Sequence, residues 1–148
     1  MSTGPLQFSA ECLFADIAAN KPSKTLLSYF STTDTVVLRH DCVYNPSPFS
    51  FEGLHAVRSY FDLLSLNWKK SDMQIHSKEV DLTKSQVVLR ASVQWTWRIS
   101  GNSWREVFTC TLDYDEEVKV KKFIVETDVP KSSCVMHAVD SGPLKTLH

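Results

Sequence analysis

The chain has 148 residues, of which 43% are hydrophobic and 11% aromatic, and this is enough to build the core of one ordinary domain. Its 16 basic residues nearly balance 17 acidic ones, so the net charge of -1 gives no electrostatic reason to expect nucleic acid or a membrane surface as a partner. No apolar run approaches the roughly 18 residues of a membrane helix, and residues 1–6 lack the pattern of a targeting segment. We therefore expect a soluble, cytoplasmic protein.

Two helices are predicted at the start of the chain. Leu13, Phe14 and Ile17 recur at helical spacing after a candidate N-cap at Ser9, and the polar residues 20–22 end this pattern. Ser23 can cap a second, short helix that ends before residues 31–34.

A strand, a glycine turn and a third helix are predicted next. Val36, Leu38 and His40 share one parity of an extended run, so a strand would point His40 to the same side as the two apolar residues. Phe51 then leads into a turn at Gly53. The helix after this turn carries one apolar face, formed by Leu54, Val57, Phe61 and Leu64.

From residue 73 onward the period changes from helical to alternating. Three turns, at 83–85, 100–102 and 115–117, separate the alternating runs, which predicts an antiparallel meander with one apolar face. The sequence thus indicates an α+β fold in which three early helices pack in a strongly curved antiparallel sheet. We expect one domain over residues 1–148, with a core at about 8–128 and a tail at 129–148 that packs in part through Val135 and Met136.

The four cysteines, Cys12, Cys42, Cys110 and Cys134, lack the close paired spacing of a zinc site, so we expect reduced, buried thiols. The acidic run at 115–117 lies in a predicted turn without a converging histidine and is explained as solvated turn residues. We predict neither a metal nor a cofactor.

The element order, the Phe51-Glu52-Gly53 turn and the closing strand Lys122–Asp128 resemble the nuclear transport factor 2-like superfamily, especially its SnoaL-like branch. The resemblance spans roughly Phe8 to Asp128. It implies a cone-like, cystatin-like roll that encloses an apolar pocket. Members of this superfamily include ketosteroid isomerases, polyketide cyclases, scytalone dehydratases, non-catalytic ligand binders and transport factors.

Comparison with the ketosteroid isomerases implies that His40 lies at or near the position of their general base. The same comparison puts Phe14 where they carry an oxyanion-stabilising tyrosine, and the region 108–112 where they carry a protonated aspartate. Since neither can donate a hydrogen bond as those groups do, steroid isomerisation by that mechanism is disfavoured. The segment 125–130 also lacks the acidic-aromatic-arginine pattern that ends the transport factors, which argues against nuclear import.

Three residues are candidates for catalysis. His40 is the first, because histidine as a residue type suits proton transfer near neutral pH, although a histidine at a strand end can simply bind backbone. Tyr44 has the same parity as His40 if the strand continues, although a turn there would point Tyr44 outward. Asp128 lies near the expected mouth of the cone, although exposure to solvent would leave it an ordinary surface carboxylate. The candidate ligand-binding residues, which can also be plain core, are Phe14, Ile17, Phe61, Leu64, Trp95, Trp97, Phe108, Cys110 and Phe123.

Two functions follow from this sequence. The first is a cofactor-independent isomerase, cyclase or lyase that binds a small hydrophobic molecule and uses His40 as acid and base; it predicts a polar dyad in an enclosed cavity. The alternative is a non-catalytic ligand-binding or protein-interaction module, which predicts a cavity that is purely apolar or filled by side chains. The polar-aliphatic outer sheet face, with Gln94, Thr96, Thr109 and Thr111, suggests a homodimer in either case.

Overall fold

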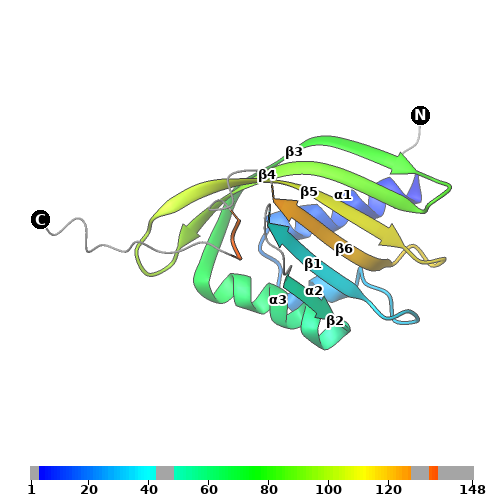
Figure 1. The fold of residues 1–148 in the computed structure, drawn as a ribbon, viewed down its shortest axis with the longest axis horizontal. Helices are drawn as coiled ribbons and strands as arrows, with labels where there is room; N and C mark the ends of the chain where they lie inside the picture. Colours follow the sequence, from blue (N-terminus) through cyan, green and yellow to red (C-terminus); the bar gives the residue numbers. More distant parts are fainter. Residues whose placement is uncertain (1–3, 43–48, 128–133, 137–148) are drawn as a thin grey trace, which may run out of the picture.

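The computed structural model describes residues 4–42, 49–127 and 134–136, and these form three helices and one six-stranded sheet (Figure 1). In chain order the elements are α1 (Pro5–Ala18), α2 (Ser23–Leu27), β1 (Val37–Cys42), β2 (Phe49–Glu52), α3 (Leu54–Asn67), β3 (Trp68–Asp81), β4 (Gln86–Trp97), β5 (Ser103–Tyr114) and β6 (Val120–Thr127). The α+β class is therefore as predicted. None of these helices is long and apolar enough to cross a membrane.

The sheet is strongly curled but not closed. Its strand order is β2-β1-β6-β5-β4-β3, and all neighbours are antiparallel except β1 and β6, which run parallel (Figure 1). This parallel pair is the one departure from the expected antiparallel sheet. Helix α3 packs against β2 and β3, the two edge strands, and so bridges the open side of the curl.

Gly53 makes the turn between β2 and α3 that its sequence predicts. Its backbone has φ 88° and ψ 160°, a region open essentially to glycine alone. In this conformation its N–H donates to the Val36 carbonyl at 2.8 Å, while its own carbonyl accepts the Val57 N–H at 3.0 Å. The glycine thus ties the start of α3 to the chain just before β1.

Helix α1 begins earlier than expected, at Pro5 rather than after Ser9. Gly4 is its N-cap, and Pro5 suits the first helical turn because its fixed φ is already helical and its missing N–H has no partner to lose there. The early start adds Leu6 to the buried face of the helix.

The predicted alternation holds in β4 and β5, whereas most of β3 is exposed, and the three predicted turns fall where expected. The inward residues of β4, β5 and β6 pack with α1 and α3 in one core, in which Phe123 contacts Phe14, Phe30 and Phe61. Of the tail, Val135 is buried and Met136 packs partly against this core, as expected.

Candidate functional site

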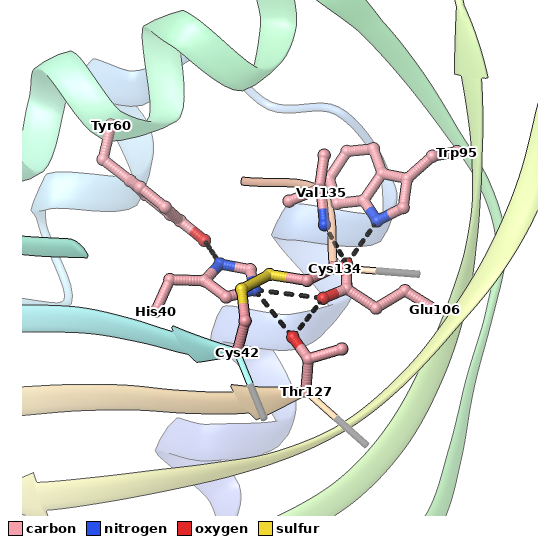
Figure 2. Close-up of a disulfide and its surroundings, with 8 residues drawn as sticks. All are labelled: His40, Cys42, Tyr60, Trp95, Glu106, Thr127, Cys134 and Val135. Atoms are coloured by element: carbon pink, nitrogen blue, oxygen red, sulfur yellow. Dashed lines mark hydrogen bonds and ion pairs between the residues drawn. A yellow bond between two sulfur atoms is a disulfide. The ribbon is translucent and has the colours of Figure 1, made fainter. Parts of the chain in front are cut away.

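His40 lies on β1 with its ring inside the curl of the sheet, as its parity with Leu38 predicts (Figure 2). It is only 2% exposed, and both ring nitrogens have side-chain partners from other elements. Nδ1 lies 2.8 Å from the Tyr60 hydroxyl on α3, and Nε2 lies 3.0 Å from Oε2 of Glu106 on β5. The ring is therefore not tied to backbone, and it links a phenol to a carboxylate.

Glu106 is a fully buried carboxylate, 1% exposed, whose two oxygens both accept hydrogen bonds. The Trp95 indole N–H donates to Oε1 at 2.7 Å, with a longer bond of 3.4 Å from the Val135 backbone N–H. The Thr127 hydroxyl donates to Oε2, where His40 also binds. This set of donors matches an ionised carboxylate, which accepts at every position and has no proton to place.

The neighbours of His40 also determine where its proton resides. A carboxylate can only accept, so His40 carries its hydrogen on Nε2 and donates it toward Glu106. Nδ1 then holds a lone pair and accepts the hydrogen of the Tyr60 hydroxyl. Burial, and then the charge of Glu106, raise the pKa of Tyr60 well above its ordinary value, so this residue remains a neutral phenol. Tyr60, His40 and Glu106 thus form a buried chain of hydrogen bonds, which we call the relay.

The expectation of reduced thiols is wrong for two of the four cysteines. Cys42, at the end of β1, and Cys134, in the tail, form a disulfide across the face of His40, with their Cα atoms 5.9 Å apart (Figure 2). They are 92 residues apart in sequence, so spacing gives no sign of the pairing. The bond holds Val135 against Glu106. Cys12 and Cys110 are free, and burial raises the pKa of the Cys110 thiol.

A small cavity opens beside the relay, with about 50 Å³ accessible to the centre of a water-sized sphere. His40, Tyr60, Glu106 and Trp95 form part of its wall. The predicted ligand-binding residues that also line it are Phe14, Ile17, Phe61, Leu64, Trp95, Phe108 and Phe123. The cavity is therefore mostly apolar; its polar lining consists of the relay and of Lys21, Ser23, Ser65 and Lys70.

Other predicted site residues lie elsewhere. Trp97 packs against Trp68 and Trp104 rather than on the cavity, and Cys110 is buried in the core. Both were predicted on the inner face of the sheet, as is found, but Trp97 lies at the end of β4, beyond the cavity, and Cys110 lies in the middle of β5. The predicted catalytic residues Tyr44 and Asp128 lie outside the described residues.

Sequence reasoning missed Tyr60, Glu106 and Thr127. The signal for Glu106 was present, because it shares the parity of Phe108 and Cys110, and an acidic residue on an apolar strand face needs a partner. Tyr60 likewise falls three residues after Val57 on the buried face of α3. What the sequence could not give was the meeting of these side chains on His40.

Within the described residues, one group of side chains could approach a metal ion. Ligand atoms of His40, Glu106 and Cys134 lie within 4.8 Å of one another. The Cys134 sulfur is bonded to Cys42 and so cannot bind as a thiolate, and the other two already bind each other. In this state the cluster is suited to proton transfer and not to holding a metal.

Comparison with known proteins identifies the fold. No family model matches the chain, and no curated protein matches it significantly. Among solved structures, the chain is similar to the pinacolase BvnE from Penicillium brevicompactum, with a TM-score of 0.68, 17% identity and coverage of 89% of this chain and 90% of that one. It is also similar to the epoxide hydrolase/cyclase-like enzyme SalBIII, with a TM-score of 0.70, 12% identity and coverage of 84% of this chain and 91% of that one.

A third similar structure is RV0760c from Mycobacterium tuberculosis, in complex with estradiol-17beta-hemisuccinate. Its TM-score is 0.68 at 12% identity, with coverage of 86% of this chain and 95% of that one. At such low identities the likeness concerns the fold alone, and it agrees with the curled six-stranded sheet and the three helices described above. The chain therefore has the cone-shaped fold of the nuclear transport factor 2-like superfamily.

Proposed function

We propose that this protein binds a small apolar molecule in the cavity and converts it by cofactor-independent acid–base catalysis, as an isomerase, cyclase or lyase. The observation that carries this proposal is the buried relay of Tyr60, His40 and Glu106 on the wall of a mostly apolar cavity. Purely structural packing has little use for a buried, ionised carboxylate and a histidine that face open space.

The geometry supports a simple proton cycle. A ligand oxygen that approaches Tyr60 would take the proton of its hydroxyl, so that a phenolate remains. The lone pair of His40 Nδ1 is then free to take a proton from a ligand carbon. Glu106 would stabilise the imidazolium that forms. The proton on His40 then returns across the 2.8 Å bond to the Tyr60 oxygen, which restores both groups. No electron leaves the ligand, so isomerisation, ring closure or elimination needs no oxidant.

The relay also supplies what sequence comparison with the ketosteroid isomerases found missing. Phe14 cannot donate a hydrogen bond, but the Tyr60 hydroxyl on the same cavity wall can. In an apolar cavity one such donor is worth about 3 kcal/mol of transition-state stabilisation. Tyr60 is therefore the proposed electrophilic residue, and His40 the proposed base.

The proposal can be tested without knowledge of the substrate. A panel of small apolar ketones is incubated in deuterium oxide, and incorporation of deuterium next to the carbonyl is followed by mass spectrometry. We expect exchange of at least one ketone, with a loss of about 10²–10⁴-fold in His40→Gln. His55→Gln is the matched control, because His55 is exposed at the start of α3. Exchange that is absent throughout, or unchanged in His40→Gln, contradicts catalysis.

The competing function is the non-catalytic module, and one observation favours it. Both carboxylate oxygens of Glu106 and both ring nitrogens of His40 have partners within the chain itself, so the network can serve to order the cavity wall. Tight binding of an apolar ligand with no exchange would support this function.

Two further expectations from the sequence stay predictions. A homodimer through the outer sheet face can be tested by sedimentation at several concentrations. The cytoplasmic location is opposed by the Cys42–Cys134 disulfide, because disulfides persist mainly in oxidising compartments. Alkylation under denaturing conditions, directly after isolation from the native compartment, would decide: two alkylated thiols, Cys12 and Cys110, indicate the disulfide, and four indicate a reduced chain.

A further inference from the structure

Lys70 places a cation on the wall of the same cavity as His40. It lies on β3 directly opposite Trp95 of β4, so the two side chains stand on the same face of the sheet. Trp68, two residues earlier, is also buried on this inner face, whereas Lys69 between them is exposed. Lys70 is half-buried, and its direction is determined by the alternation of the strand.

No anion balances this lysine among the described residues. Burial lowers the pKa of Lys70, and the nearby charge of Arg98 lowers it further. By contrast, Lys78, on the same strand, pairs with Glu11, and Lys119 donates to the Ser28 carbonyl. A half-buried cation without a partner costs free energy, which an anion from outside would offset.

The remaining polar groups of the cavity strengthen this positive character. Lys21 follows α1, Ser23 begins α2 and Ser65 lies in the last turn of α3, and all three line the cavity together with Lys70. Glu106 is the one acid among the lining residues, and both of its oxygens are occupied. An anion that enters the cavity would therefore find hydrogen-bond donors near Lys70, whereas the carboxylate of Glu106 at the relay already has its own donors.

We propose that Lys70, supported by Lys21, Ser23 and Ser65, forms a subsite for a carboxylate carried by an otherwise apolar ligand. The carboxylate binds the ammonium of Lys70, and the apolar body lies along Phe61, Phe108 and Trp95 toward His40. The inference deepens the proposed function, since it names the ligand as an apolar carboxylic acid, but anion binding at Lys70 does not require that His40 catalyse anything.

The test uses matched pairs of neutral and charged ligands of the same shape. A set of apolar carboxylic acids of increasing size, from phenylacetate through 2-naphthylacetate to a tricyclic acid, is titrated beside the corresponding primary amides, with binding followed by calorimetry at low salt. We expect the wild-type protein to bind at least one acid about tenfold more tightly than its amide, the difference between a charge-assisted and a neutral hydrogen bond.

Lys70→Met keeps the length and apolar stem of the side chain and should abolish this preference, while Lys70→Arg should retain most of it. Lys69→Met is the control, because it removes an adjacent lysine from the opposite face. Equal affinity for acids and amides in the wild-type protein, no binding of any acid, or a preference that survives in Lys70→Met would overturn the subsite. A preference that is intact in His40→Gln, with no deuterium exchange in the wild-type protein, would support the subsite while the proposed catalysis fails.

Discussion

Replacing Glu106 by glutamine should reverse the position of the proton on His40. Glu106 is buried, it accepts from Trp95 and Val135 at one oxygen, and it accepts from Thr127 and His40 at the other. An amide has one accepting and one donating end. The two N–H groups of Trp95 and Val135 cannot accept, so the amide oxygen must face them, and the amide nitrogen must face His40.

The ring of His40 can adapt to this change by moving its hydrogen from Nε2 to Nδ1. Nε2 then accepts from the amide, and Nδ1 donates to the Tyr60 oxygen, while the Tyr60 hydroxyl hydrogen loses its acceptor. About four charge-assisted bonds become neutral or are rearranged, while the cost of burying a charge disappears. We expect a net loss of about 1–3 kcal/mol in the free energy of unfolding.

The chemical consequence is larger than the structural one. The lone pair of His40 would face the amide, not the cavity side occupied by Tyr60, so the proposed base would be blocked. In hydrolytic triads a wrong histidine tautomer costs about 10⁴-fold in rate. Loss of most of the deuterium exchange, with the fold retained, is therefore the expected result.

The assay combines urea denaturation with nitrogen NMR of histidine-labelled protein, in which protonated and unprotonated ring nitrogens are distinct. The expected readout is Nε2–H in the wild-type protein and Nδ1–H in Glu106→Gln. Glu126→Gln on β6 is the control, because Glu126 is exposed and should change stability by less than about 0.5 kcal/mol. A wild-type His40 with its proton on Nδ1, or a tautomer that does not change in Glu106→Gln, would refute the reasoning.

Three other predictions follow from single features of the fold. Cys134→Ser opens a loop of 92 residues, so the chain-entropy relation predicts a loss of about 4–5 kcal/mol in the free energy of unfolding. Urea denaturation beside the free-thiol control Cys12→Ser measures this loss, and equal midpoints for the two variants would contradict it. Tyr60→Phe leaves Nδ1 of His40 without a donor and should cost about 1–2 kcal/mol at pH 7. The folded chain raises the pKa of Tyr60, so as the pH rises the tyrosine of the unfolded chain loses its proton first. The free energy of unfolding of the wild-type protein should therefore fall above pH ~10, and it should fall less steeply in Tyr60→Phe. Parallel pH curves for the two proteins would count against this. Gly53→Ala should lower the free energy of unfolding by about 1–3 kcal/mol through backbone strain alone, since an added Cβ would meet no atom within 4 Å. Thermal denaturation measures this loss, and a smaller decrease in Tm would mean that the turn relaxes.

The sequence by itself determined the secondary structure and the direction of single side chains. Helical spacing, strict alternation and the Gly53 turn each depend on residues a few positions apart, and such local patterns predicted the sheet turns and the inward direction of His40. The start of α1 was missed because two capping signals, Gly4-Pro5 and Ser9, lie close together and local rules do not choose between them.

The tertiary structure alone decided which side chains meet. Glu106 reaches His40 across 66 residues, and Cys134 reaches Cys42 across 92, through a parallel pairing of β1 with β6 and a return of the tail that no local pattern encodes. Strand order and sheet curvature are set by how the whole core packs, and they bring β1, β5 and α3 together around one cavity. The residues of the relay were thus visible in the sequence one at a time, but their chemistry arises only from distances that the folded chain creates.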